Sequence, residues 1–182
     1  MNKRLSFNLL FAIFILVILV FSTWANTKTI IVNQDTNIAE NSKDSNYGKN
    51  GYTVVWKSAG WNNETWYKFE LPIIESGQRI DEAYLKVFVY GEGDNSGPIG
   101  AFFCPDNNWD ETTLTWNNAP RSKVESVPLA VATPTANNTI VSWDLGPFLR
   151  ANREKTTFTF VLRSITEPYK RTTYYSKESG MT

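Results

Sequence analysis

The clearest alternation of apolar and polar positions in the chain lies in residues 83–90. The odd positions hold the apolar residues Ala83, Leu85, Val87 and Val89. The even positions hold Tyr84, Lys86, Phe88 and Tyr90. Because successive side chains of a strand point to opposite faces, this pattern predicts a strand with one face in a hydrophobic core. Residues 156–163 alternate in the same way, with an inner row of Phe158, Phe160 and Leu162.

Other short apolar runs, separated by turn-forming residues, extend this pattern along the chain. Further strands are predicted at residues 29–32, 52–57, 66–71, 99–104, 124–131, 140–145 and 172–176. Residues 35–51 are polar and predict a loop, whereas residues 148–152 predict a single helical turn. Regularly spaced short strands without sustained helical periodicity are typical of an all-β sandwich of two antiparallel sheets.

A distinctive stretch at residues 109–120 separates two of these strands. It begins with Trp109, continues to Trp116, and ends in the turn-forming run Asn117-Asn118-Ala119-Pro120. We expect a long loop that buries both indoles beneath it, followed by a strand. No residue in this stretch forms a catalytic signature.

The N-terminus has the pattern of an export signal. Lys3 and Arg4 precede an unbroken apolar run over residues 9–21, and Ala25 ends a small-residue cleavage pattern. The run is shorter than the roughly 18 to 20 residues of a spanning helix. We therefore expect a signal peptide over residues 1–25, one domain over residues 26–182, and a secreted or cell-surface protein without a membrane segment after cleavage. An uncleaved membrane anchor is the alternative.

The amino-acid composition argues against some classes of function. The chain has 18 Lys and Arg against 18 Asp and Glu, which is not the basic excess of a nucleic-acid-binding protein. Aromatic residues make up 14% of the chain and His is absent, so rings are plentiful while the commonest general base and metal ligand is missing. The single cysteine, Cys104, is expected to be a small buried core residue.

Five short motifs, in order, resemble the DNRLRE domain, which overlaps carbohydrate-binding module family 96 and the disaggregatase-related repeat. They are Asp35 with Asn46-Tyr47-Gly48, residues 67–72, residues 80–87, residues 109–120 and Tyr175-Ser176-Lys177-Glu178. The resemblance implies a jelly-roll sandwich on a secreted or surface protein, with acidic polysaccharides such as alginate among its ligands. Family members normally continue into a further strand, so the resemblance implies a domain lacking its usual last strand. Either the chain is a fragment of a longer, multidomain surface protein, or the gene is truncated.

Two predicted strands carry the residue types of a glycan-binding surface. Their outward residues, with one residue from strand 156–163, are Trp66, Lys68, Tyr84, Lys86, Phe88, Tyr90 and Arg163. Aromatic rings stack on the apolar faces of sugars, and ammonium or guanidinium groups pair with uronate carboxylates. If the strands share a sheet, these side chains form one ligand-binding surface. The alternative is that loops cover this face and its rings pack as ordinary core.

Metal binding and catalysis have weaker support. Oxygen donors near the predicted strand ends are Asp35, Asn37, Asp44 and Asp144, and such donors can hold a structural calcium ion. No Asp-x-Asp-x-Asp run supports one, so solvated loop acids are the preferred explanation and no cofactor is expected. No pair of carboxylates has a spacing that marks a glycosidase or lyase.

Three functions follow from the sequence. The first is a non-catalytic carbohydrate-binding module for an acidic, alginate-like polysaccharide. A structural or adhesive spacer of a surface protein is the second, and a fragment of a polysaccharide lyase or disaggregating enzyme is the third.

Overall fold

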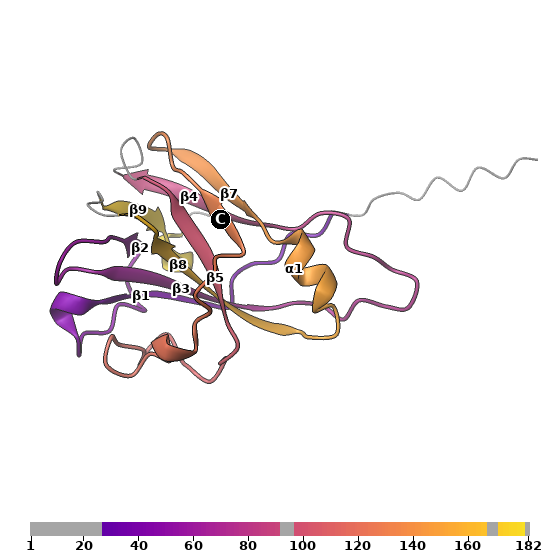
Figure 1. Cartoon of the computed structure of the whole chain (residues 1–182), viewed down its shortest axis with the longest axis horizontal. Coiled ribbons are helices and arrows are strands. Elements are labelled where there is room, and N and C mark those ends of the chain that lie inside the picture. The colour runs from indigo at the N-terminus through magenta and orange to yellow at the C-terminus, as the bar shows by residue number, and fades with distance from the viewer. Residues whose placement is uncertain (1–26, 92–96, 167–170, 181–182) are drawn as a thin grey trace, which may run out of the picture.

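The computed structural model describes residues 27–91, 97–166 and 171–180, and the predicted signal peptide lies outside these residues. They form two antiparallel β-sheets packed as two layers (Figure 1). The prediction of an all-β sandwich is therefore confirmed. Among the residues that the structure describes, no helix is both long and apolar enough to span a membrane.

Strands that follow one another in the chain mostly alternate between the two sheets. The five-stranded sheet has the order β1 (Gln34–Ala39), β3 (Asn63–Glu70), β8 (Thr157–Ser164), β5 (Ile99–Cys104), β6 (Ala130–Ala132). The four-stranded sheet has the order β2 (Tyr52–Val55), β9 (Thr172–Tyr175), β4 (Tyr84–Gly91), β7 (Thr139–Asp144). Helical segments of the described chain are η1 (Glu40–Ser42), η3 (Arg121–Lys123), α1 (Gly146–Ala151) and η4 (Lys177–Ser179).

The main core lies between the sheets and has the side chains that alternation predicts. Leu85, Val87 and Val89 of β4 are buried there, together with Phe158, Phe160 and Leu162 of β8. The α1 helix closes one end of this core (Figure 1), where the Phe148 ring lies 4.7 Å from that of Phe103. Trp143 is fully buried and donates a 2.8 Å hydrogen bond to the Ile99 carbonyl, so this indole is satisfied within the core.

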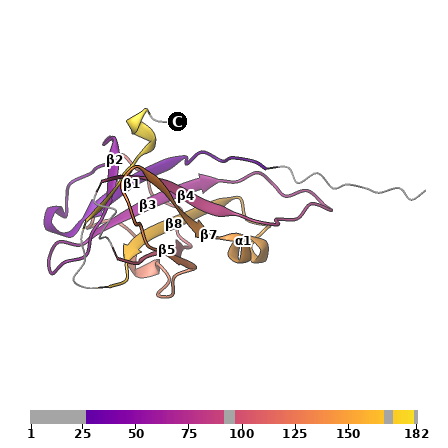
Figure 2. The ribbon, with the colours of Figure 1, turned by 90° about the horizontal axis from the view of Figure 1, so that it is seen from above.

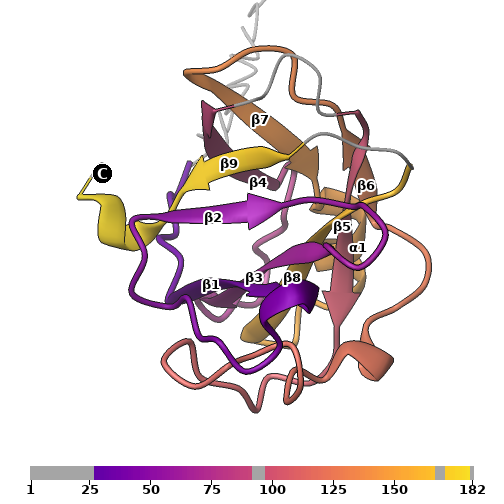
Figure 3. The same cartoon turned by 90° about the vertical axis from the view of Figure 1, so that its left-hand side faces the viewer.

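A second hydrophobic cluster covers the outer face of the five-stranded sheet. The loop at residues 105–125 lies across that face (Figure 3), and its buried side chains meet those of β1, β3, β5 and β8. The cluster contains Ile38, Trp66, Phe102, Cys104, Trp109, Leu114, Trp116, Val124 and Val161. The predicted burial of Trp109, Trp116 and Cys104 is confirmed, although in this second core.

The first strand is not where the sequence pattern places it. Residues 29–32 form no strand, and β1 instead covers Gln34–Ala39, within the predicted polar loop. The strand forms because its backbone pairs with β3 in continuous antiparallel register from Gln34 to Ala39. Asp35 accepts a hydrogen bond from the distant Lys177 amide, so tertiary pairing overrides the low strand propensity of Asp and Asn.

Two other predicted boundaries also differ. The expected strand at residues 124–131 is reduced to β6, Ala130–Ala132, because the backbone bends repeatedly between residues 124 and 129. The expected helical turn is confirmed as α1, which starts earlier, at Gly146, and carries Pro147 in its first turn. Proline suits that position because its missing N–H would have no helical partner there.

Candidate functional site

The predicted ligand-binding residues come from both sheets and do not form one surface. Trp66 and Lys68 lie on β3 and Arg163 on β8, both in the five-stranded sheet, whereas Tyr84 and its outward neighbours lie on β4 of the four-stranded sheet. The outer faces of the two sheets point to opposite sides of the sandwich (Figure 3). The expectation of a shared surface is therefore wrong.

Trp66 and Lys68 are buried under the loop at residues 105–125. Trp66 is 0% exposed, and its ring packs edge-on against Trp109 at 6.0 Å. The Lys68 Nζ donates to the Trp109 carbonyl and lies 4.6 Å from the centre of that indole. Burial lowers the pKa of Lys68, while the nearby carboxylate of Asp110 opposes this shift. Both residues were expected to be exposed, and this expectation is wrong. They are buried and hold the loop in place.

Arg163 is engaged with a buried acid on the same covered face. Its Nε lies 3.0 Å from the Oε1 of Glu64, and its Nη2 donates to Oε2 at 3.0 Å. Arg121 donates to the same Oε1 from Nε and Nη2 at 3.2 and 3.0 Å and stacks 3.5 Å over Trp116. Arg163 is thus part of a protein charge network, not the free clamp that the sequence suggested.

The outward residues of β4, in contrast, lie on an open surface. Tyr84 is 47% and Tyr90 52% exposed, Lys86 is exposed, and Phe88 is half-buried. Together with Tyr52 and Tyr175 these residues form what we call the tyrosine face. The tyrosine face thus consists of Tyr52, Tyr84, Lys86, Phe88, Tyr90 and Tyr175.

The rings of the tyrosine face form a row across the three neighbouring strands β2, β9 and β4. The Tyr175 ring lies 5.6 Å from Phe88 and 5.0 Å from Tyr90, tilted by 43° and 51°. Tyr52 pairs with Tyr175 across β2 and β9, and the Lys86 Nζ lies 5.8 Å from the centre of the Tyr84 ring. Such a row offers apolar ring faces with phenol groups beside them, which suits the mixed polarity of sugars.

Tyr52 and Tyr175 were not among the residues expected at the site. Period two places Tyr174 and Tyr175 on opposite faces but does not say which one faces the core. The structure buries Tyr174 and leaves Tyr175 half-buried on the outer face. The signal that could have found this face lies in β2, the strand that pairs with β9. Thr53 and Val55 of β2 are buried, so Tyr52 and its cross-strand partner Tyr175 lie on the outer face.

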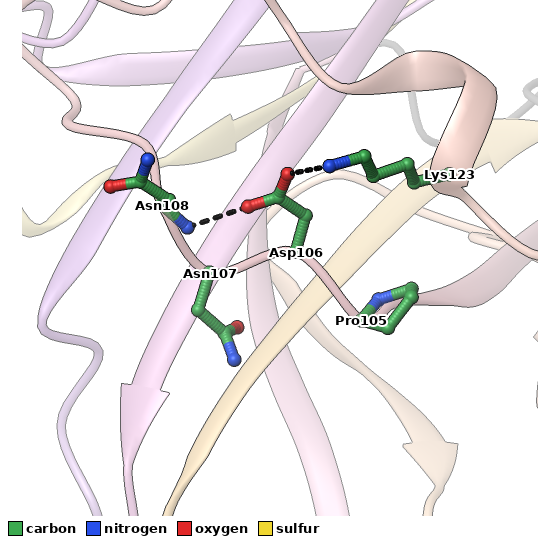
Figure 4. Close-up of a pocket in the computed structure, with 5 residues that line it drawn as sticks. All are labelled: Pro105, Asp106, Asn107, Asn108 and Lys123. Carbon is green, nitrogen blue, oxygen red and sulfur yellow. Dashed lines mark hydrogen bonds and ion pairs between the residues drawn. The ribbon is translucent and has the colours of Figure 1, made fainter.

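A shallow hollow on the other side of the molecule carries less chemistry. It measures about 530 Å³ and is lined by Pro105, Asp106, Asn107, Asn108 and Lys123 (Figure 4). Lys123 donates to Asp106 at 2.6 Å, and this bond, with one from the Asn108 amide, lowers the pKa of Asp106. The two charges neutralise each other, so neither is left to attract a ligand.

The oxygen donors considered for calcium are not brought together. Asp44 accepts a hydrogen bond from Asn117 Nδ2 at 2.7 Å, and Asp144 accepts one from the Gly146 amide at 2.8 Å. Asp35 alone meets other carboxylates, those of Glu111 and Glu178. Burial raises the pKa of Asp35 to about 7, the Lys177 amide opposes this, and the Glu178 carboxylate adds to it.

Comparison with known proteins shows the family to which the chain belongs. A gellan lyase from a Bacillus species is 28% identical over 162 residues, which cover 84% of this chain and 6% of that protein. The chain thus spans a small part of the enzyme's length. The model of carbohydrate-binding module family 96 matches residues 26–182. This match includes both sheets and the loop between β5 and β6, and the chain therefore belongs to carbohydrate-binding module family 96.

Proposed function

We propose that this domain is a non-catalytic module that binds an acidic polysaccharide on the tyrosine face and works in a secreted or cell-surface protein. The single observation that carries the proposal is the exposed row of aromatic rings on β4 and β9, with Lys86 on the same face. Trp66 and Trp109 on the other sheet's outer face are buried, whereas the rings of the tyrosine face are open to a polymer.

The shape of the tyrosine face suits an extended chain. Tyr84 and Tyr90 lie at the two ends of β4, about 20 Å apart at the usual rise of a strand. Ring contacts between Phe88, Tyr175 and Tyr90 restrain these side chains before binding, which reduces the entropy lost on association.

The acidic character of the ligand is inferred from Lys86. This side chain is exposed, it lies between Tyr84 and Phe88 on the outer face, and its cross-strand neighbour is the uncharged Ser142. An ammonium group beside aromatic rings pairs with a carboxylate on a sugar that stacks on those rings. Ion pairing at an exposed site weakens with salt, so the affinity of this face for an acidic polysaccharide should fall as ionic strength rises.

Binding without catalysis is favoured by what the tyrosine face presents. Phenol rings and one ammonium group can hold a sugar chain, whereas glycoside cleavage needs two carboxylates facing each other across the bond. The similarity to the gellan lyase covers 6% of that enzyme, as expected for an accessory module. We infer that the domain is part of a larger protein exported through the basic and apolar segment at residues 3–21.

Titration of the full chain with alginate, gellan and a neutral glucan, followed by calorimetry, tests this proposal. We expect saturable binding to alginate or gellan that weakens between low and physiological salt, and much weaker binding to the glucan. The double variant Y84A/Y90A should lose most of the affinity. Trp61, an equally exposed aromatic residue outside the tyrosine face, gives the matched control W61A, which should bind as the original chain does. Equal losses in both variants, or preference for the glucan, would contradict the proposal.

A second assay tests the enzymatic alternative. The protein is incubated with alginate and gellan, and ultraviolet absorbance reports unsaturated sugar ends while a reducing-sugar assay reports hydrolysis. We expect neither signal to rise above the rate without protein. Product that accumulates in proportion to protein concentration would show that the domain is catalytic.

A further inference from the structure

Three carboxylates from distant parts of the chain meet at one edge of the sandwich. Asp35 lies on β1, Glu111 lies in the loop at residues 105–125, and Glu178 lies on η4, which follows β9 beside β2 (Figure 2). Each offers an oxygen atom, and these three atoms lie within 4.8 Å of one another. Like charges repel at this distance, which favours a positive charge nearby or a proton on one of the carboxyl groups.

The protein holds these three groups in position. The Asp35 amide donates to Oε2 of Glu111 at 3.0 Å, and the Lys177 amide donates to Oδ2 of Asp35 at 3.0 Å. The Lys177 Nζ lies 2.8 Å from Oε1 of Glu111 and also contacts Glu178. Partial burial disfavours the charge on Lys177, but its bonds to both glutamates outweigh this and raise its pKa. One positive charge therefore already lies at the edge of the cluster.

One oxygen of the cluster is buried without a partner. Asp35 is 2% exposed, and among the described residues no donor reaches its Oδ1. A buried carboxylate oxygen without a donor or a cation is costly. Consistent with this cost, burial raises the pKa of Asp35. This unpartnered atom belongs to the same carboxylate that meets Glu111 and Glu178, so it points to a missing ligand at the cluster.

We propose that Asp35, Glu111 and Glu178 bind one calcium ion. Three carboxylates and the Lys177 ammonium sum to −2, which a divalent cation neutralises. Oxygen ligands lie about 2.4 Å from calcium, so two ligands on opposite sides of one ion are about 4.8 Å apart, and the observed separations fit this limit. Oxygen-only ligands favour a hard cation such as calcium over zinc or copper.

The ion joins three segments that are far apart in the chain. These are the start of β1, the loop that covers the second hydrophobic cluster, and the turn after β9. The loop side is also fixed by Asn46, whose Nδ2 donates to the Glu111 carbonyl at 2.6 Å. Gly48 packs so closely there that a Cβ atom would lie 2.0 Å from the same oxygen. We therefore assign the site a structural role, distinct from the tyrosine face.

Calorimetry of the full chain, depleted with chelator and titrated with calcium chloride without polysaccharide, tests the site. We expect one equivalent to bind with a dissociation constant between about 1 μM and 1 mM. Saturating calcium should raise the thermal midpoint by about 4 °C or more. The variant E178Q alters an exposed turn residue, so it should fold and yet bind calcium at least tenfold more weakly. Asp44, an exposed acid away from the cluster, supplies the control D44N, which should bind calcium normally.

Several outcomes would overturn the assignment. One is the lack of saturable binding heat at calcium concentrations up to 10-fold above the expected dissociation constants. The others are E178Q binding calcium as tightly as the original chain, equal weakening of calcium binding in D44N, or magnesium binding as tightly as calcium. Sugar binding is measured separately, so loss of one property does not decide the other. If the original chain binds polysaccharide but no calcium, the proposed function stands and only the metal site is rejected.

Discussion

The outer faces of the two sheets have similar side chains, but one face is buried and the other is exposed. On the five-stranded sheet, Trp66 and Lys68 are buried beneath the loop at residues 105–125. On the four-stranded sheet, Tyr84 and Lys86 have the same aromatic and basic character, and both remain exposed. The difference lies in the loop between β5 and β6, which brings Trp109 and Trp116 onto one face and leaves the other uncovered.

This contrast shows that residue type alone does not make a binding surface. A ring beneath a loop contributes its apolar area to folding, whereas an exposed ring retains that area for a ligand. Charged side chains on the two faces differ in the same way. Arg163 forms an ion pair with Glu64, whereas Lys86 has a cation-π contact with Tyr84 and is exposed to solvent. The comparison predicts that substitutions on the covered face change stability and those on the tyrosine face change binding.

Truncating the buried indole on the covered face should have the largest effect. We expect W66A to lower the free energy of unfolding by about 3–5 kcal/mol, because it leaves a large cavity under the loop. Chemical denaturation monitored by circular dichroism measures this change. The matched variant Y84A, on the open face, should cost less than about 0.5 kcal/mol. Similar losses in the two variants would mean that both faces are packed alike.

Neutralising the acid of the covered face should have the next largest effect. E64Q leaves Arg163 and Arg121 without their shared carboxylate, and we expect a loss of about 1–3 kcal/mol in unfolding free energy. Polysaccharide binding by the folded variant should not change. E125Q, at an exposed acid of the same loop, serves as the control and should be as stable as the original chain. Loss of binding in E64Q would place Arg163 at the ligand after all.

Removing the central ring of the tyrosine face should reduce affinity more than stability. Tyr175 contacts both Phe88 and Tyr90, so Y175A should weaken polysaccharide binding about tenfold, or about 1.4 kcal/mol. Calorimetry against alginate or gellan measures the change. Y175F keeps the ring and loses only the hydroxyl, and we expect it to bind within a small factor of the original. A full loss in Y175F would show that hydrogen bonding, not stacking, provides the affinity.

The lysine of the open face should have the smallest effect. K86Q should weaken binding to an acidic polysaccharide about threefold, or about 0.6 kcal/mol, at low salt. The difference from the original chain should disappear at high salt, where ion pairs are screened. K43Q changes an exposed lysine outside the tyrosine face and should have no effect. A loss in K86Q that persists at high salt would argue against pairing with a carboxylate.

Much of the architecture was predictable from the sequence. Alternation in β4 and β8 identified the core residues Leu85, Val87, Phe158 and Phe160, all of which the structure buries. The burial of Trp109 and Trp116 followed from the length and turn chemistry of their loop. The strand β1 was missed because its Asp35, Thr36 and Asn37 are polar, and their burial depends on partners far away in the chain.

The sequence by itself determined that this protein is a β-sandwich with aromatic and basic side chains opposite its core. Period two follows from backbone geometry, so it needs no knowledge of the neighbouring strands. Only the tertiary structure decided which outer face remains open, and that β3 and β4 belong to different sheets. It also decided that Asp35, Glu111 and Glu178 meet. Sheet membership, loop covering and long-range clusters depend on contacts between distant segments, which local patterns do not encode.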